Sequence, residues 1–501
     1  MAYQLQKFFK EQAKRTIRKY QLQTYRRMRD AKRREKRTGK RVRRPASTAI
    51  PRWGFEQQFN PFYARAKAVS LSHGIEARIL AKSYEPRPSL DLRIPKDGGG
   101  YRKISVYSIP DAAVGTWLHR RLLRRNSSLL SASAFGYRSD QNANDAIRHI
   151  ADAVARNPRL FVVEYDFEKF FDSIDHSYLL SVLGKYFQVR TDEVAVLRAL
   201  LSGKSATEKD YKNKVFTARK RGIPQGNTIS LFLANAVCYE LDKELEVPGI
   251  TFARYADDIL VVAKSYSEAC AAADTILRWG ERSKVRINYR KSDGISLLTT
   301  RGAGEIKSKN SLVFLGCEIA NSGVSPAERR INRVKTKIAR VVYQHLVQAP
   351  KKRTFNKKRI LASVDWDLVT CVNELRRMIY GRLSEADLTD ALSRKDPRKA
   401  IRSHMSGFAM VDNPDRFREL DGWIVGLLER AYSMRAALVS KLGVKPLQLT
   451  RKSLIKGDWY QFKDFVQETQ LPSSFRAWLY IRMMYRSRGM RALAAPLYDY
   501  L

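Results

Sequence analysis

The sequence predicts a mixed α/β body that is followed by an α-helical region. Two apolar segments, residues 159–165 and 250–262, have the pattern of buried strands, and a helical pattern at residues 230–245 lies between them. From residue 325 onward, apolar residues recur at helical spacing. Strands that alternate with helices are typical of a sheet covered by helices.

Each strand segment ends at a turn or at an acidic residue. Residues 90–94 and 101–106 alternate between apolar and polar side chains around a glycine-rich turn, which predicts a hairpin. The segment 159–165 runs directly into Asp166, and the segment 250–262 contains a tight turn at Asp257 and Asp258. The three aspartates are therefore expected at strand ends.

The helical region begins with a recognisable start signal. Ser325 and Glu328 have capping-box spacing, and Pro326 would occupy the first helical position. Ile331, Val334 and Ile338 then follow on one face, with basic residues on the others. We expect a basic amphipathic helix here, with further helices beyond it.

The composition favours a polyanionic partner. The chain has 501 residues, with 94 Lys and Arg against 50 Asp and Glu, a net charge of +44. This length is enough for two or three domains, and the hydrophobic fraction of 44% is enough for a sizeable core. So positive a surface attracts nucleic acid, and since no long apolar span is present we expect no membrane partner.

The first 45 residues are the most basic segment. They carry 18 Lys or Arg and three Asp or Glu, a local net charge of +15, with Phe8, Phe9, Tyr20 and Tyr25 interleaved. One interpretation is an arm that binds nucleic acid through cations and stacking rings. The other is a solvated basic helix or a disordered tail.

Cysteine usage favours a reducing compartment. The four cysteines form no C-x-x-C pair, which argues against a zinc ribbon and a disulfide framework. The N-terminus lacks the pattern of a secretion signal. We therefore expect a cytoplasmic protein.

The adjacent carboxylates Asp257 and Asp258 indicate a metal site. Like charges between apolar strands repel each other, and a divalent cation would remove that cost. Asp166, 91 residues upstream, would complete an oxygen site suited to Mg²⁺, with Mn²⁺ as the alternative. Two such ions can support phosphoryl transfer from a nucleotide.

The ordered set of motifs resembles the reverse transcriptase family, in its bacterial and group II intron- or retron-like branch. The resemblance covers about residues 90–345 and is greatest to stand-alone reverse transcriptases of anti-phage defence. It rests on motifs that occur in the family's order: Asp166 to His176, Arg221 to Ser230 with its Pro-Gln-Gly core, Tyr255-Ala256-Asp257-Asp258, Ile287 to Ser292, and the primer-grip-like Phe314-Leu315-Gly316-Cys317.

The resemblance implies a right-hand polymerase with fingers and palm, followed by an α-helical thumb and a helical C-terminal region. We expect a basic N-terminal arm at residues 1–50 and fingers and palm at 51–320. The thumb would occupy residues 321–400 and the C-terminal region residues 401–501.

The resemblance also implies roles for single residues. Asp166 and Asp257 would bind the metals with support from Asp258, and Lys291 would face the leaving pyrophosphate, unless it is an ordinary surface lysine. Phe171 would exclude a ribose 2′-hydroxyl, and its alternative is a core aromatic. Four more residues would contact the nucleotide or template: Lys96, Arg102, Arg138 and Gln225.

The implied activity is RNA-directed DNA synthesis from dNTPs on an RNA template. We expect the template to be a structured non-coding RNA and the product to be DNA, in anti-phage defence, and a homo-oligomer is left open. The alternative is an RNA-binding protein that assists splicing. Two tyrosines near the C-terminus, Tyr498 and Tyr500, are candidates for protein priming, unless they only dock the tail.

Overall fold

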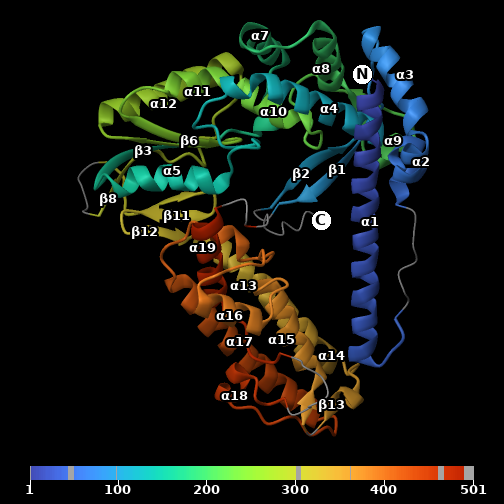
Figure 1. The fold of residues 1–501 in the computed structure, drawn as a ribbon, viewed down its shortest axis with the longest axis vertical. Helices are drawn as coiled ribbons and strands as arrows, with labels where there is room; N and C mark the ends of the chain where they lie inside the picture. Colours follow the sequence, from blue (N-terminus) through green and yellow to red (C-terminus); the bar gives the residue numbers. More distant parts are fainter. Residues whose placement is uncertain are drawn as a thin grey trace. The chain divides into compact units, whose positions relative to one another are not determined.

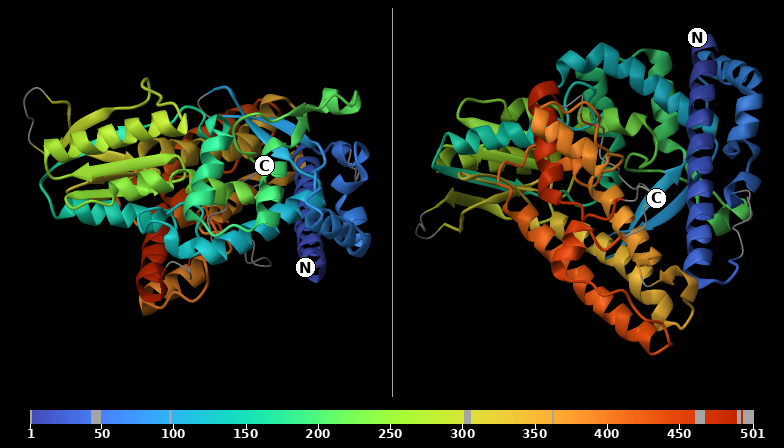
Figure 2. Two further views of the ribbon diagram at one scale, coloured as in Figure 1. Left: turned by 90° about the horizontal axis from the view of Figure 1, so that it is seen from above. Right: turned by 60° about the horizontal axis from the view of Figure 1, so that its bottom comes forward.

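The computed structural model describes residues 2–42, 50–96, 99–300, 306–361, 363–460, 468–489 and residue 493. It divides the chain into two compact units, which Figures 1 and 2 show as ribbons. Unit 1 comprises Met1–Arg26 and Ala46–Asn310, and unit 2 comprises Arg27–Pro45 and Ser311–Leu501. This division differs from the four predicted segments, because the basic N-terminal residues are shared between the units.

A five-stranded sheet lies at the centre of unit 1. Its order is β6-β7-β3-β8-β9, and its neighbours are antiparallel except for the last pair. Four consecutive buried residues, 160–163, show that both faces of β3 are covered. The strands are β3 (Arg159–Tyr165), β6 (Ile250–Tyr255), β7 (Asp258–Ala263), β8 (Gly294–Thr299) and β9 (Ser308–Lys309).

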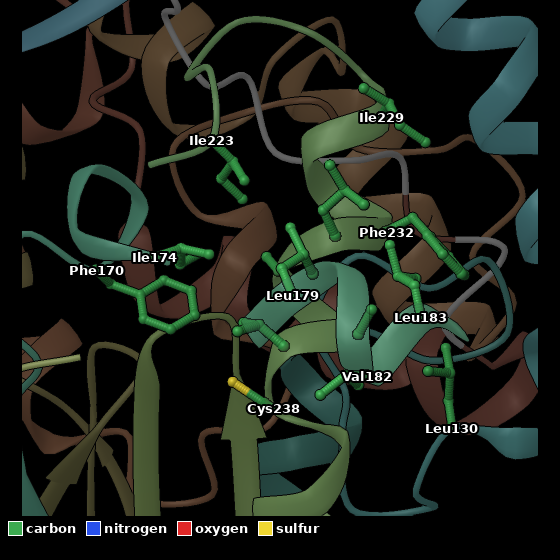
Figure 3. Packing of buried hydrophobic residues seen from close by; sticks show 14 of the residues in the cluster. Leu130, Phe170, Ile174, Leu179, Val182, Leu183, Ile223, Ile229, Phe232 and Cys238 are labelled. Atoms are coloured by element: carbon green, nitrogen blue, oxygen red, sulfur yellow. The ribbon is translucent and has the colours of Figure 1, made fainter. Parts of the chain in front are cut away.

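Helices pack on this sheet and against one another. Helix α12 (Tyr266–Ser283) packs on β3 and β7, and α5 (Ala143–Ala155) packs on β6. Figure 3 shows Phe170, Leu179 and Phe232 in the apolar core beside them, where a fully buried side chain of this size contributes about 1.5–3 kcal/mol. The other long helices of unit 1 are α3 (Ala68–Leu80), α4 (Ile109–Asn126), α7 (His176–Tyr186), α8 (Thr191–Ser202), α10 (Ile229–Val237) and α11 (Tyr239–Leu245), and the short ones are α2 (Pro61–Ala66), α6 (Phe170–Ser173) and α9 (Glu208–Lys212).

A second, smaller sheet contains the predicted glycine-turn hairpin. Strands β1 (Ser89–Pro95) and β2 (Tyr101–Val106) pair in antiparallel fashion, and Leu90 lies in a small core with Phe59 and Tyr211. The sheet order is β2-β1-β4-β5, with β4 at Lys204–Ala206 and β5 at Thr217–Ala218.

Helix α1 (Ala2–Thr38) accounts for the basic N-terminal segment. Leu5, Phe9, Ala13 and Ile17 recur every fourth residue and are buried in unit 1. The first half of the helix is therefore neither a free arm nor a solvated tail. The sequence analysis did not identify this apolar stripe, because most of the residues between its members are basic or otherwise polar.

The second segment of unit 2, Ser311–Leu501, begins with a three-stranded sheet and continues mainly as helices. The basic amphipathic helix α13 starts at Glu328, not at Pro326, because Pro326 still pairs with Cys317 across β11 and β12. The N-cap is Ala327, whose side chain has no atom that could accept a capping hydrogen bond. The predicted capping box is therefore wrong.

Helices α13 and α17 lie side by side in unit 2 (Figure 1). The strands of unit 2 are β10 (Leu312–Phe314), β11 (Cys317–Ala320), β12 (Gly323–Pro326), β13 (Ile360–Leu361) and β14 (Val364–Asp365). Its helices are α13 (Glu328–Val342), α14 (Gln348–Lys351), α15 (Trp366–Ile379), α16 (Glu385–Arg394), α17 (Asp415–Ser440), α18 (Arg451–Lys456) and α19 (Ser474–Arg488). Among the helices described in either unit, none is long and apolar enough to cross a membrane.

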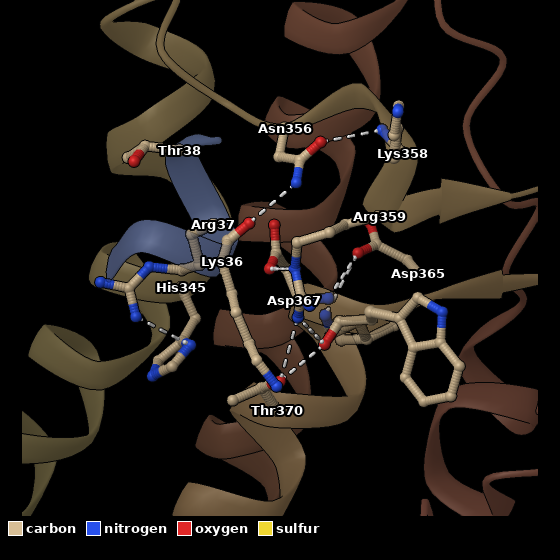
Figure 4. A network of polar contacts seen from close by, with 12 residues as sticks. Lys36, Arg37, Thr38, His345, Asn356, Lys358, Arg359, Asp365, Asp367 and Thr370 are labelled. Atoms are coloured by element: carbon tan, nitrogen blue, oxygen red, sulfur yellow. Dashed lines mark hydrogen bonds and ion pairs between the residues drawn. The ribbon is translucent and has the colours of Figure 1, made fainter. Parts of the chain in front are cut away.

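A buried network of charged residues joins the elements of unit 2. The Arg435 guanidinium donates to Asp365 at 2.6 Å and to Asp367 at 3.0 Å, and both carboxylates are almost fully buried. Arg359 donates to Asp367 at 2.7 Å. Figure 4 shows these carboxylates beside the last turn of α1, where Asn356 donates to the carbonyl of Lys36.

Candidate active site

Two of the predicted carboxylates lie on the turn between β6 and β7. Tyr255 pairs with Asp258 at the end of the ladder, so Ala256 and Asp257 form a two-residue turn. Ala256 has a φ of 62°, a left-handed conformation that tight hairpin turns require. The turn therefore places two successive aspartates at the end of the β6–β7 hairpin.

Asp166 follows the neighbouring strand and lies beside this turn. Tyr165 on β3 pairs with Ile259 on β7, and one further step of that register sets Asp166 opposite Asp258. The predicted convergence of the three aspartates at strand ends is thus present in the backbone pairing.

Neighbouring carboxylates raise the pKa values of Asp257 and Asp258. Burial raises the pKa of Asp257, and the charge of Asp166 raises it further. The Asp258 side chain reaches solvent, yet the surrounding protein removes enough of its hydration to raise its pKa to about 6, with Asp257 and Asp166 adding repulsion. No ion pair joins these three aspartates to any residue described in the structure.

The donor chemistry of this site fits divalent cations. Three carboxylates with uncompensated charge offer the hard oxygen ligands that Mg²⁺ and Mn²⁺ prefer. The side chains do not form a closed ligand set: within the described residues, no group of three or more His, Cys, Asp or Glu is placed to hold a metal ion. The fit therefore rests on ligand type and charge.

Two cations of the β1–β2 hairpin act on the same site. The charges of Arg102 and Lys96 lower the pKa of Asp257, opposing the effects of burial and of Asp166. Arg102 pairs with Ile94 across the ladder, and Lys96 closes the hairpin by donating its N–H to the carbonyl of Gly100 at 3.0 Å. Both side chains are exposed, so they are available to a phosphate chain.

The loop that carries Gln225 is attached to this hairpin. The N–H of Ser105 on β2 donates to the carbonyl of Gln225 at 2.7 Å. Gly226, at a φ of 131°, passes so close to the carbonyl of Ser105 that a Cβ would collide with it. A glycine is required there, and the half-buried Gln225 is held at the base of the hairpin.

A third loop holds the backbone of Asp166. The hydroxyl of Ser292 accepts from the N–H of Asp166 at 3.0 Å, and the N–H of Asn288 donates to the Asp166 carbonyl at 2.7 Å. Lys291 lies within this loop with an exposed side chain. The sequence analysis singled out Lys291 from this motif and did not predict the contacts that Asn288 and Ser292 make with Asp166.

The sequence around this site matches a known protein family. Residues 94–319 match the model of "Reverse transcriptase (RNA-dependent DNA polymerase)". The chain carries a reverse transcriptase domain. This confirms the resemblance inferred from the motifs and the predicted fold class, a mixed α/β polymerase domain followed by helices.

Relatives of the reverse transcriptase domain are distant. Protein YkfC of Escherichia coli is 22% identical over 223 residues, which are 37% of this chain and 57% of that protein. The retron Mx162 reverse transcriptase of Myxococcus xanthus is 27% identical over 173 residues, 33% of this chain and 34% of that protein. The chain thus spans less than two thirds of these relatives. The apo telomerase of Candida tropicalis aligns over 55% of this chain and 66% of that chain at 14% identity, with a TM-score of 0.39.

Phe170 and Phe171 have different surroundings in the reverse transcriptase domain. Phe170 is 2% exposed and belongs to the core, whereas Phe171 is only half buried. The Phe171 ring packs edge-on against Phe170 and against Tyr137, with centroids 5.5 and 6.4 Å apart. Of the two neighbours, Phe171 is the one whose side chain is partly exposed.

Three other predicted site residues remain, Arg138, Tyr498 and Tyr500. The Arg138 guanidinium donates to the carbonyl of Ser131 at 2.7 Å and pairs with Asp140 at 2.6 Å, so its own loop already satisfies much of it. This favours a structural role for Arg138. Tyr498 and Tyr500 lie outside the described residues.

Proposed function

We propose that this chain copies RNA into DNA, with Asp166, Asp257 and Asp258 as its catalytic carboxylates. The observation that carries the proposal is their shared negative charge at the ends of neighbouring strands, which no described residue balances through an ion pair. The hairpin cations Lys96 and Arg102 oppose this charge at Asp257. A purely structural site would pair such carboxylates directly.

Asp166, Asp257 and Asp258 would hold two Mg²⁺ ions, or Mn²⁺ in their place. The ions would supply activation of the primer 3′-hydroxyl and stabilisation of the leaving pyrophosphate. Lys96 and Arg102 would bind the triphosphate of the incoming dNTP, and the exposed Lys291 would neutralise the pyrophosphate as it leaves. Gln225 would contact the nucleotide from its glycine-supported loop, with Phe171 beside the 2′ position of the sugar.

Primer extension tests this proposal. The parent protein should extend a DNA primer on an RNA template with dNTPs and far less with NTPs. Asp166→Ala should abolish extension, because losing the carboxylate removes several kcal/mol of transition-state stabilisation. Asp274→Ala, the same change at an exposed position on α12, is the matched control and should extend like the parent. DNA synthesis by Asp166→Ala at the parental rate would rule out the assignment.

The net charge of +44 supports an RNA partner, with helix α1 as part of its binding surface. Deleting residues 1–45 would also remove the core residues Leu5 and Phe9, so a charge substitution is the cleaner test. Replacing the exposed Lys14, Arg18 and Lys19 by Gln should reduce RNA affinity and make its salt dependence shallower, by a slope of about two if all three contact phosphates. The charge-preserving exchange Lys14→Arg, Arg18→Lys, Lys19→Arg should bind like the parent.

The template and the biological role form the finer part of the proposal. We propose a structured non-coding RNA as template and a role in anti-phage defence in the cytoplasm, on the basis of the motif resemblance and of cysteine usage. Sequencing the nucleic acid that copurifies with the protein tests the first point. Phage challenge of cells that carry the parent or Asp166→Ala tests the second, since defence by synthesis requires the carboxylate.

Splicing assistance is the second candidate function. It is favoured by relatives such as the "Uncharacterized 91 kDa protein in cob intron" of Schizosaccharomyces pombe, 27% identical over 36% of this chain and 21% of that protein. A splicing helper needs RNA binding but no synthesis. Intron splicing that is retained by Asp166→Ala, together with a parent protein that extends no primer, would favour this function.

A further inference from the structure

Arg254 is a fully buried charge two residues before the catalytic turn. It lies on β6 and is 0% exposed, although an arginine loses much hydration when it is buried. The predicted mechanism uses the turn residues that follow Arg254 and gives no task to Arg254 itself. Its contacts explain why a cation is retained there.

The Arg254 guanidinium bonds to three different groups. Its Nε donates to Asp242 Oδ1 on α11 at 2.6 Å, and its Nη2 donates to the other oxygen of the same carboxylate. Its Nη1 donates to Asn235 Oδ1 on α10 at 3.1 Å and to the carbonyl of Ala256 at 3.2 Å. One side chain therefore ties two helices to the turn that carries Asp257.

The backbone of Arg254 holds a second loop against the same turn. Its N–H donates to the carbonyl of Ser133 at 2.9 Å, and its carbonyl accepts from the N–H of Phe135 at 2.8 Å. Asn235 also donates through Nδ2 to the carbonyl of Gly136 at 2.9 Å. Arg254 and Asn235 thus link the turn, both helices and this loop into one network.

Gly136 shows how closely this loop covers the turn. A Cβ at residue 136 would lie 2.5 Å from the backbone nitrogen of Ala256, closer than real Cβ contacts. The turn is therefore enclosed by the loop on one side and bonded by Arg254 through its carbonyl. The two constraints act on the two peptide units of Ala256, the residue directly before Asp257.

We propose that Arg254 is a positioning residue: by bonding the Ala256 carbonyl it fixes the turn and so the direction of the Asp257 carboxylate. The proposal rests on the proposed polymerase function, for which it names an additional residue. Misplacing a catalytic group by about 1 Å can reduce the rate about 100-fold. Arg254, which contacts the turn through the Ala256 carbonyl, would therefore affect kcat without touching the substrate.

The unit 2 pair of Arg435 with Asp365 provides a matched control. Arg435 is 1% exposed and bonds the Asp365 carboxylate and the carbonyl of Leu346, much as Arg254 bonds Asp242 and Ala256. Its bonds fix helices and a strand of unit 2. None of these bonds reaches a turn that carries a candidate catalytic group. Arg→Lys at both positions makes the same chemical change in two buried ion pairs.

The experiment measures kcat and KM for dNTP together with the unfolding temperature. Arg254→Lys keeps a cation beside Asp242 and loses the planar fork that reaches Ala256. We expect kcat per folded molecule to fall about 10- to 100-fold with KM within twofold of the parent. Arg435→Lys should lower the unfolding temperature and leave kcat per folded molecule unchanged. Unchanged kcat in Arg254→Lys, or an equal loss in both variants, would overturn the proposal.

Two further measurements keep the outcome decisive. If Arg254→Lys does not fold, Asn235→Leu preserves the Arg254–Asp242 ion pair, removes the Asn235 bonds, and should still lower kcat with little change in KM.

The second measurement is the unfolding temperature with Mg²⁺ and without nucleotide. Mg²⁺ should raise the unfolding temperature of the parent, should raise that of Arg254→Lys by less, and should leave that of Asp257→Asn unchanged. This readout needs no synthesis, so a parent that makes no DNA defeats the proposed function while the Mg²⁺ response still tests Arg254. An equal Mg²⁺ response in parent and Arg254→Lys would contradict the positioning role.

Discussion

Two pairs of aspartates among the described residues, Asp365 with Asp367 and Asp257 with Asp258, have different partners. In unit 2, Asp365 and Asp367 accept from Arg435 and Arg359 at 2.6–3.1 Å, and Asp365 also accepts from the first turn of α15. In unit 1, Asp257 and Asp258 form no ion pair with a described residue, and neighbouring carboxylates add to the effect of burial in raising their pKa values. The paired aspartates of unit 2 stabilise the fold, whereas we propose a catalytic role for the unpaired aspartates of unit 1.

The difference lies in what balances the charge. A buried carboxylate that is paired contributes to folding, and removing its partner is costly. A carboxylate left unbalanced costs stability until a ligand supplies the missing positive charge. The distinction depends on side chains from elsewhere in the fold, since the arginines that pair with Asp365 and Asp367 come from other segments.

The largest expected effect is on synthesis at the unbalanced pair. Asp257→Asn keeps the size of the side chain and removes its charge, so primer extension should fall by at least about 100-fold, because several kcal/mol of transition-state stabilisation are lost. The unfolding temperature of the metal-free protein should stay equal or rise, since a repulsive charge is gone. A lower unfolding temperature in Asp257→Asn would break the comparison.

The second effect is on stability at the balanced pair. Asp365→Asn leaves part of the charge of Arg435 buried without its partner, and should lower the free energy of unfolding by about 3–5 kcal/mol. Denaturant titration measures this change, with Asp257→Asn as the parallel sample. Extension per folded molecule should remain parental. Full stability of Asp365→Asn would show that the network in Figure 4 adds nothing to folding.

The third effect contrasts two neighbouring rings in unit 1. Phe171→Ala should raise ribonucleotide relative to deoxynucleotide incorporation by about tenfold or more, since relief of a clash that costs about 1.4 kcal/mol corresponds to a factor of ten. Phe170→Ala should instead destabilise the core by about 3–5 kcal/mol and leave the ratio unchanged. Matched dNTP and NTP assays measure the ratio, and an unchanged ratio in Phe171→Ala would remove its role in sugar selection.

The smallest effect is a dependence on pH. The pKa of Asp258 is about 6 in the folded protein against an ordinary 3.8, so the folded state binds more protons between these values. The stability contributed by this proton is present below about pH 4 and is lost as the pH rises through 6. In metal-free buffer, Asp258→Asn should unfold at a higher temperature than the parent at pH 7.5 and at the same temperature near pH 4. A constant difference across this range would contradict the pKa shift.

The sequence predicted the strands that carry the site. The bounds of β3 match the prediction, because a run of apolar residues that ends at Asp166 has few alternatives. The hairpins at residues 89–106 and 250–263 also follow from alternation and turn residues.

Other features depend on contacts that are distant in sequence. The burial of Leu5 and Phe9 requires the helices they pack on, so the basic residues dominated the interpretation of α1. The start of α13 was wrong because pairing with β11 competes with helix capping for Pro326. Arg254 stands beside the acidic turn in the sequence, yet its task depends on Asn235 and Asp242. Local patterns identify such residues only when their partners are nearby in the chain.

The close approach of Gly136 to Ala256 has a consequence for how freely this region can diversify. Every other amino acid adds a Cβ that would collide with the Ala256 nitrogen, so a saturation library at residue 136 should return glycine almost exclusively. Gly74 and Gly184 have no atom within 4 Å of such a Cβ, and their libraries should accept many residues. An engineer who wishes to alter the loop before the catalytic turn must therefore leave residue 136 as it is and vary positions on either side.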